Sequence, residues 1–415
     1  MNPVAIDPVS ARATLILCCL VALCEGIDLQ AAGVAAAGIV PAFHPSSAQL
    51  GVFFSGGTLG LFVGALIGGR LADSIGRKPV LVASVLLFAV FSLLTPLASD
   101  MTSLSALRVL TGFGLGGAFP NLIALVSESA SENRRSASVA AAYSAAPFGG
   151  AVVSLISYAL GPQHWQWIFI IGGILPAVLA PVIARMLPES PAFVQVRVSL
   201  RSNSTPGPVA TSRPGDFRAL FTEGRALRTT LLWASFFLGL LTLFLLLNWL
   251  PTLLQSAGFT KPQVAGAQIG FNLGGSLAAL LVGRLLEGRT RRLTIFAIFT
   301  ALPVFLYLLA TVPTHFFALL SIVFLLGCAV LAGQAFFYAT APANYPTRNR
   351  GIGVGAAIAM GRLGSVAGPL LGGVLTASGK NSSQLLMSLL PLAIAGSVLA
   401  VLLAWRMDAR SAVEG

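Results

Sequence analysis

The sequence predicts an all-α integral membrane protein, in which twelve transmembrane helices form two six-helix, pseudo-symmetric bundles. Composition, the spacing of apolar runs and an internal repeat support this fold class. Of the 415 residues, 56% are hydrophobic and only 9% are charged, a balance that soluble globular domains do not have. Most of the chain is therefore expected to be solvated by lipid.

Twelve apolar runs are long enough to cross a bilayer, which takes about 20 mostly apolar residues in a helix. They lie at 14–37, 49–71, 79–98, 102–126, 137–160, 165–187, 229–250, 263–286, 293–312, 316–340, 352–376 and 385–405. A Pro-, Ser-, Gly- and Arg-rich stretch separates the first six runs from the last six. The predicted domains are therefore an N-terminal bundle (1–187), a cytoplasmic linker (188–228) and a C-terminal bundle (229–415).

The basic residues predict the orientation of the chain. With a cytoplasmic N-terminus the outer loops carry only Lys261 and Lys380, and nearly all other loop Arg and Lys residues fall inside. Because cytoplasmic loops are enriched in Lys and Arg, both termini are expected to lie in the cytoplasm. The expected location is the inner (plasma) membrane of the cell. The net charge of +12 is then directed at the anionic inner leaflet rather than at nucleic acid.

An internal repeat relates the two predicted bundles. The loop segment 69–78 (GRLADSIGRK) aligns without a gap to 283–292 (GRLLEGRTRR), 214 residues later. A second match, 132–135 against 347–350, falls at a spacing of 215. Two parallel repeats are the plan of many secondary transporters, whose substrate site lies at the bilayer midplane between the repeats.

The first apolar run contains two carboxylates, Glu25 and Asp28. Charged side chains at this depth are rare and usually functional, and three residues of spacing put both on one helix face. Counting the helical rise places Arg108 within reach of Asp28. We therefore expect all three residues to handle the coupled proton, with Glu25 as its seat; a purely structural Asp28 bridge is the alternative.

Arg362 lies in the eleventh run, with no acid within one turn and no other membrane-buried acid in its half. An unpaired guanidinium at the midplane is costly, so it is expected to face a cavity and receive an anion. Its planar fork suits a carboxylate. In the alternative, Arg362 bonds backbone carbonyls near Gly361 and Gly364.

Polar and aromatic residues inside the spans are candidates for holding the rest of a substrate. A polar side chain in lipid is otherwise poorly satisfied. The predicted substrate contacts besides Arg362 are Gln30, Trp249, Phe271, Asn272, Gln334 and Tyr338.

The loop after the second run is expected to act as an inner gate. The gate residues Gly69, Asp73, Gly76 and Arg77 lie at the cytoplasmic rim. Asp73 can cap helix ends or pair with arginines only when the two halves are closed on the cytoplasmic side, and these bonds are lost when that side opens.

This loop resembles the signature of the major facilitator superfamily, as does the Arg108-x-x-x-Gly112-x-Gly114-x-Gly116 pattern. Within that superfamily, four segments resemble the aromatic acid:proton symporter family, above all its 3-(3-hydroxyphenyl)propionate transporters. They are LCEGIDLQ (23–30), LPESP (187–191), WLPT (249–252) and GRLGS (361–365). Ser74 departs from the pattern, because the superfamily often has arginine there.

The resemblance and the buried charges together predict a symporter that imports an aromatic monocarboxylate with protons by alternating access. The expected substrate is of the hydroxyphenylpropionate or hydroxybenzoate type. Another small organic anion, or drug export on the same fold, is the alternative. No metal-ligand cluster or nucleophile–base pair points to an enzyme, so no catalytic residue, metal or cofactor is expected. The predicted partners are the acid, the proton and the lipid bilayer, with no nucleic acid, for a monomeric protein.

Overall fold

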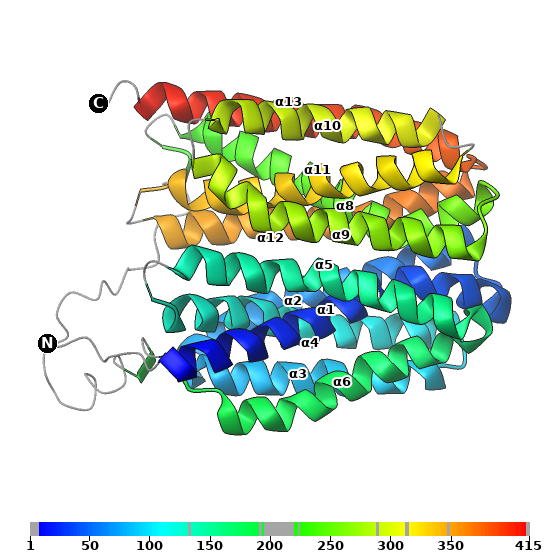
Figure 1. Ribbon diagram of the computed structural model, residues 1–415, viewed down its shortest axis with the longest axis horizontal. Helices are drawn as coiled ribbons and strands as arrows, with labels where there is room; N and C mark the ends of the chain where they lie inside the picture. The colour runs from blue at the N-terminus through cyan, green and yellow to red at the C-terminus, as the bar shows by residue number, and fades with distance from the viewer. Residues whose placement is uncertain are drawn as a thin grey trace, which may run out of the picture. The chain divides into compact units, whose positions relative to one another are not determined.

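The structure, a computed structural model, describes residues 8–131, 134–190, 193–194, 220–222, 225–287, 290–311, 315–346 and 349–411. Within these ranges, twelve helices are long and apolar enough to cross a membrane, which confirms the predicted fold class (Figure 1). The spanning helices are α1 (Pro8–Phe43), α2 (Ser47–Ile75), α3 (Arg77–Leu94), α4 (Met101–Ser129), α5 (Arg135–Leu160), α6 (Trp165–Met186), α8 (Ala226–Ser256), α9 (Lys261–Glu287), α10 (Arg291–Thr311), α11 (Phe316–Ala343), α12 (Arg350–Ala377) and α13 (Ser382–Ser411). Short 3-10 turns, η1 (Thr95–Leu97) and η3 (Pro162–His164), follow α3 and precede α6.

The chain divides into two compact units. The first comprises residues 1–44 and 56–211, and the second comprises 45–55 and 212–415. The first turns of α2 therefore pack with the second unit, where the Ser55 hydroxyl donates to Val366 O at 3.0 Å. Most of the predicted linker, 188–228, lies outside the described residues.

The same helix pairs recur in both units. In the first, α1 packs against α5 and α6, and α3 packs against α4 and α6; in the second, α8 packs against α12 and α13, and α10 packs against α11 and α13 (Figure 1). Helices α1, α3, α4, α5 and α6 thus have equivalents in α8, α10, α11, α12 and α13, as the repeat in the sequence predicts.

Glycines set the closest helix contacts at equivalent positions. A Cβ on Gly60 of α2 would overlap the carbonyl of Val109 on α4, and one on Gly274 of α9 would overlap that of Phe324 on α11. The glycines are 214 residues apart and their partners 215, the spacings of the two sequence matches. Small residues let membrane helices approach to backbone contact, so the repeat preserves these contacts as well as the loops.

The α5–α1 and α12–α8 contacts follow the same rule. A Cβ on Gly149 of α5 would overlap Leu23 O of α1, and a Cβ on Gly364 of α12 would overlap Phe237 O of α8. Gly149 and Gly364 are 215 residues apart and their partners Leu23 and Phe237 are 214 apart, so this contact also recurs with the repeat.

The start of α4 is fixed by a capping box. Asp100 Oδ1 accepts the N–H groups of Thr102 at 2.8 Å and Ser103 at 2.9 Å, and Ser103 Oγ accepts the N–H of Asp100 at 3.2 Å. The Ser103 N–H, together with that of Thr102, holds the pKa of Asp100 below its usual value. This cap sets the register that brings Arg108 into the first unit's interior two turns later.

Replacing Gly364 by alanine should lower the melting temperature of the detergent-solubilised protein, because the new methyl group forces α12 away from α8. Overpacking of this kind costs roughly 1–3 kcal/mol or more. Gly355→Ala is the matched control on the same helix, since a Cβ there meets no atom of the described residues within 4 Å. Equal melting temperatures for the two variants would contradict the assigned contact.

Candidate functional site

A buried ion pair joins α1 to α4 in the first unit. Arg108 Nη1 lies 2.5 Å from Asp28 Oδ1, and Arg108 Nη2 donates to the Asp28 carbonyl at 2.9 Å. The side chains are 2% and 0% exposed. The Arg108 Cζ also lies 5.6 Å from the ring centroid of Phe169 on α6, a cation–π distance. The predicted pairing of Arg108 with Asp28 is confirmed.

Small residues leave room for this pair. A Cβ on Gly57 of α2 would lie 3.5 Å from Arg108 Nη2, and one on Gly172 of α6 would lie 3.9 Å from Asp28 Oδ2. Asp28 Oδ2 and Arg108 Nε have no hydrogen-bond partner among the described residues. In the described part of the chain, Asp28 therefore binds Arg108 through one carboxylate oxygen and its own carbonyl, and Oδ2 makes no hydrogen bond.

Glu25 and Gln30 flank Asp28 on α1, and both are buried, with 2% and 4% exposure. Between the two acids, Gly26 fits directly against Ala146 O of α5. The first unit thus holds two carboxylates within one helical turn in its interior. The roles of Glu25 in proton exchange and of Gln30 in substrate binding stay predictions.

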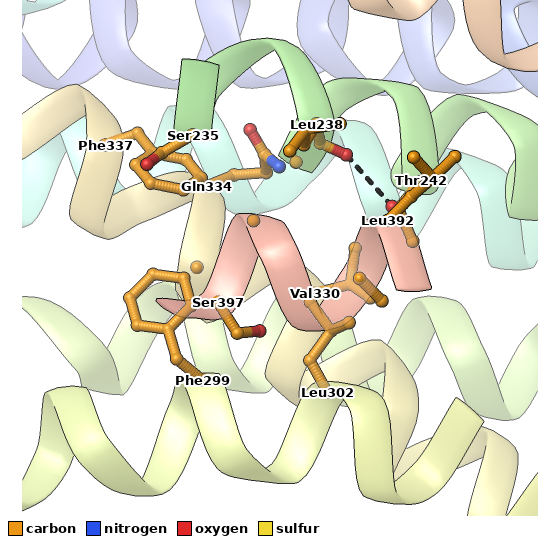
Figure 2. A pocket seen from close by; sticks show the side chains of 14 residues that line it. Ser235, Leu238, Thr242, Phe299, Leu302, Val330, Gln334, Phe337, Leu392 and Ser397 are labelled. Atoms are coloured by element: carbon orange, nitrogen blue, oxygen red, sulfur yellow. Dashed lines mark hydrogen bonds between the residues drawn. The ribbon is translucent and has the colours of Figure 1, made fainter. Parts of the chain in front are cut away.

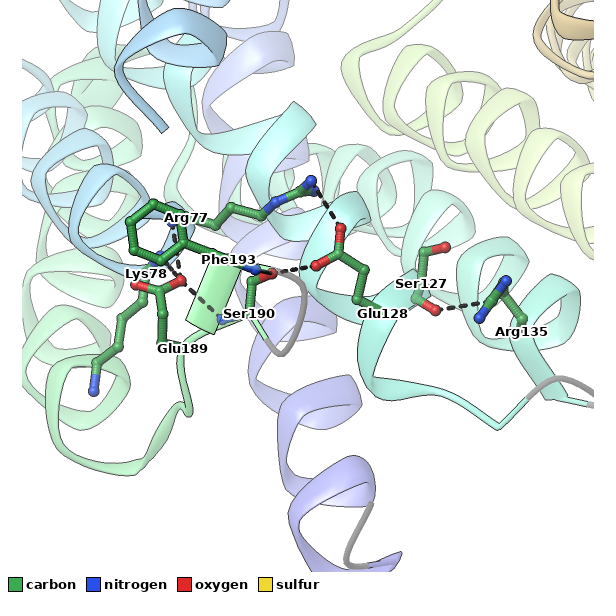
Figure 3. A network of polar contacts seen from close by, with 8 residues as sticks. All are labelled: Arg77, Lys78, Ser127, Glu128, Arg135, Glu189, Ser190 and Phe193. Atoms are coloured by element: carbon green, nitrogen blue, oxygen red, sulfur yellow. Dashed lines mark hydrogen bonds and ion pairs between the residues drawn. The ribbon is translucent and has the colours of Figure 1, made fainter. Parts of the chain in front are cut away.

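At the cytoplasmic end of the first unit, the segment after α6 binds the start of α3 and the end of α4 (Figure 3). Glu189 Oε1 accepts the N–H groups of Arg77 at 3.0 Å and Lys78 at 3.2 Å. Arg77 Nη2 lies 2.7 Å from Glu128 Oε1, and the Ser190 hydroxyl donates to Glu128 Oε2. An acid at a helix N-terminus satisfies its free N–H groups and favours its dipole.

Gly76 has two reasons to be glycine. Its φ is +107°, a conformation that side chains disfavour, and a Cβ there would overlap the Glu189 carboxylate. Glu189, and not Asp73, is therefore the acid that caps α3 in this structure. Asp73 is exposed, and a Cβ on Gly69 would meet open space. The gating roles of Gly69, Asp73, Gly76 and Arg77 stay predictions.

Sequence reasoning did not assign roles to Glu128, Glu189 or Ser190. The LPESP segment pointed to a family but not to a contact, because its partners lie 111 and 112 residues earlier in the chain. The sequence does hold one indication of these contacts. Glu128 and Glu189 are acids on the predicted cytoplasmic side, where basic residues such as Arg77 and Lys78 predominate.

In the second unit, Arg362 lies half-buried on α12. Its Nε is buried and has no hydrogen-bond partner among the described residues. Among the described residues, no acid lies within ion-pair distance of the guanidinium, and no hydrogen bond joins it to carbonyls near Gly361 and Gly364, the predicted alternative; its binding of an anion stays a prediction. Arg362 thus carries a guanidinium that the described part of its own unit does not neutralise.

The remaining predicted contacts of the second unit occupy different places. Phe271 is fully buried, with its carbonyl against Gly327 of α11. Asn272 donates to Gln268 O of its own helix at 2.9 Å. Trp249 is 1% exposed and donates its indole N–H to Pro369 O at 3.0 Å. Backbone carbonyls therefore engage the Asn272 and Trp249 donors, and contact of these residues with a substrate stays a prediction.

Gln334 and Tyr338 lie one turn apart on α11. The Tyr338 ring packs edge-to-face on Phe236 of α8, with centroids 5.0 Å apart, and Phe236 also contacts Phe337 at 5.3 Å. Gln334 is 1% exposed and lines a pocket inside the second unit (Figure 2). The structure brings these two predicted residues together around one aromatic cluster.

Residues 18–369 match the family model described as the Major Facilitator Superfamily. The chain belongs to the major facilitator superfamily. A 3-(3-hydroxy-phenyl)propionate transporter of Escherichia coli (strain K12) is 40% identical over 395 residues, which cover 95% of this chain and 94% of the relative. The 4-hydroxybenzoate transporter PcaK of Pseudomonas putida is 33% identical over 402 residues, which cover 92% and 90%.

Solved structures agree on the fold. The crystal structure of a D-xylose-proton symporter has a TM-score of 0.74 at 15% identity, covering 94% of this chain and 97% of the other. At that identity the match supports the fold alone. Family and relatives confirm that the chain is a transporter and not an enzyme. Its spans and bacterial relatives indicate a multi-pass inner-membrane protein.

Replacing Asp28 by asparagine should destabilise the protein by about 3–5 kcal/mol, because it leaves the Arg108 charge buried without a counter-charge. Thermal unfolding in detergent measures the effect. The double variant Asp28→Asn/Arg108→Gln should recover most of the loss, since it removes both charges. Asp73→Asn, at an exposed position, is the control and should match the wild type. An Asp28→Asn protein as stable as the double variant would contradict a structural ion pair.

Proposed function

We propose that this transporter imports an aromatic monocarboxylate of the hydroxyphenylpropionate or hydroxybenzoate type together with protons. The observation that carries the proposal is Arg362, a half-buried guanidinium with no acid or carbonyl partner among the described residues of its unit. Burying such a charge is unfavourable unless an anion neutralises it. The acids named for the relatives have one carboxylate that fits the arginine fork.

The proton is assigned to the acids of α1. Asp28 stabilises Arg108 through Oδ1 and has Oδ2 available, whereas Glu25 lies one turn away in the same interior. A carboxylate already paired with arginine favours its charged form. Glu25 is therefore the group that takes up and releases the exchanged proton, and Asp28 with Arg108 holds the charge balance beside it.

Coupling then follows from electrostatics. Protonation near Glu25 removes one negative charge from a low-dielectric interior, and binding of the carboxylate at Arg362 neutralises one positive charge there. A transporter with both ligands bound changes between its outward- and inward-facing states at lower cost than one with a single ligand. This alternating access makes uptake depend on the pH gradient.

The transporter acts as a monomer. Both of its termini lie in the cytoplasm, because the distribution of loop charges favours that orientation. The network of Arg77, Glu128 and Glu189 then lies at the cytoplasmic surface, where it stabilises one end of the first unit.

Purified protein in proteoliposomes should accumulate labelled 3-(3-hydroxyphenyl)propionate or 4-hydroxybenzoate when the outside is acidic, and should only equilibrate it without a pH gradient. Glu25→Gln should abolish accumulation while counterflow exchange continues, because the substrate site is intact. Gradient-driven accumulation by Glu25→Gln would remove Glu25 from coupling, and absence of uptake of any aromatic acid by the wild type would overturn the proposed substrate class.

Arg362→Lys should weaken binding of the acid by roughly tenfold or more, since a point charge replaces two parallel hydrogen bonds. Equilibrium binding of the labelled acid to the purified protein measures this. The matched control is Arg284→Lys at an exposed position of α9, which should bind like the wild type. Equal affinities for all three proteins would assign Arg362 to structure alone.

A further inference from the structure

A pocket lies in the second unit, lined by residues of α8, α10, α11 and α13 (Figure 2). Phe299, Leu302 and Val330 form much of its apolar wall, and glycines from three helices, including Gly239, reduce the side-chain volume around it. The cavity volume is about 10 Å³, which is enough for about one water molecule. An aromatic substrate is too large for this space.

Three buried polar atoms around the pocket have no hydrogen-bond partner in the described part of the chain. They are Ser235 Oγ of α8, Gln334 Oε1 of α11 and Ser397 Oγ of α13. Their residues are 0%, 1% and 7% exposed. Buried polar side chains nearly always have a partner, either protein or ordered water. These three atoms therefore point to a polar occupant.

The two serines differ from other hydroxyl residues of the spanning helices. Thr242, on the same pocket wall, donates to Leu238 O in the preceding turn at 2.9 Å (Figure 2), which is the usual way for a serine or threonine to satisfy itself in a helix. Ser235 and Ser397 make no such bond. Their hydroxyls are left for a partner outside their own helices.

The first unit fills the equivalent place with apolar side chains. Ser235 corresponds to Val21, 214 residues earlier, and Gln334 corresponds to Phe119, 215 residues earlier. Val21 belongs to a hydrophobic core cluster that contains Phe88, and Phe119 packs against it. At the positions of Ser235 and Gln334 the first unit therefore has apolar residues packed in a core, whereas the second unit has polar residues beside an open space.

Gly239 adds to this difference, because it occupies the position of Glu25 in the repeat. A Cβ on Gly239 would lie 2.7 Å from the Phe337 ring and 3.0 Å from Gln334 Nε2. Only glycine lets the Gln334 amide lie against α8. The second unit has no acid at this position, and the neutral Gln334 amide lies beside Gly239.

We propose that this pocket is a water-binding site, in which an ordered water donates to Gln334 Oε1 and accepts from the Ser235 or Ser397 hydroxyl. The water supplies the hydrogen bonds that the helices leave unmade, and holds the Gln334 amide in place between α8 and α11. This inference concerns the second unit by itself and does not rest on the identity of the transported substrate.

Hydroxyl-radical labelling by X-ray radiolysis, read by mass spectrometry on the full chain in nanodiscs, tests the site, because buried ordered water generates radicals locally. Phe299, Phe337 and Phe88 are all 3% exposed or less. Phe299 and Phe337 should be labelled several-fold faster than Phe88, which lies in the apolar core of the first unit. Equal rates for the three phenylalanines in the wild type would overturn the proposal.

Variants test which atoms hold the water. Ser235→Ala/Gln334→Leu should lower labelling of Phe337 to the rate of Phe88, whereas Thr242→Val should leave it unchanged, because that hydroxyl is already bonded to Leu238. The single variant Ser235→Ala should label Phe337 at an intermediate rate. It provides the same test if the double variant does not fold. Labelling of Phe337 that stays at the wild-type rate in a folded double or Ser235→Ala variant would show that these groups do not bind the water.

Discussion

The burial of charge in an apolar interior is the constraint on which the first unit depends. Asp28 and Arg108 come from positions 80 residues apart and are almost fully buried, so each would be highly unfavourable without the other. Their pairing fixes α1 against α4, and the Phe169 ring of α6 covers the guanidinium. The pair uses only one of the two Asp28 carboxylate oxygens, because Oδ2 has no hydrogen-bond partner among the described residues.

Glycine contacts provide the frame that holds these charges. Helices in lipid gain little from hydrophobic burial against one another and associate through close packing instead. The Gly60–Val109 and Gly274–Phe324 contacts show that both units retain the same frame at a constant spacing. Side chains inside that frame have diverged. The first unit carries Glu25 where the second carries Gly239, and the second carries on α12 an arginine, Arg362, that no acid neutralises among the residues described.

The sequence predicted the parts of the site that depend on depth and periodicity. The helical rise was enough to pair Asp28 with Arg108, because both residues had to lie at one level of the membrane. The sequence did not predict that Glu189 caps α3 or that Ser190 binds Glu128. Those contacts depend on how a short segment after α6 folds back onto a loop far away in the chain. The neighbourhood of Gln334 was unpredictable for a similar reason, since four helices from different parts of the second half enclose it.

The amino-acid sequence by itself determined the number of spans, the two repeats and the presence of charged residues that lipid cannot solvate, because these properties follow from hydrophobicity and spacing along one chain. Tertiary structure alone decided the partners of polar groups outside that pair. The N–H groups of Arg77 and Lys78 bind Glu189, and Ser235 and Gln334 lie around an open space. Such outcomes depend on distances of a few ångströms between helices, which glycine contacts and turns set and which no local pattern specifies.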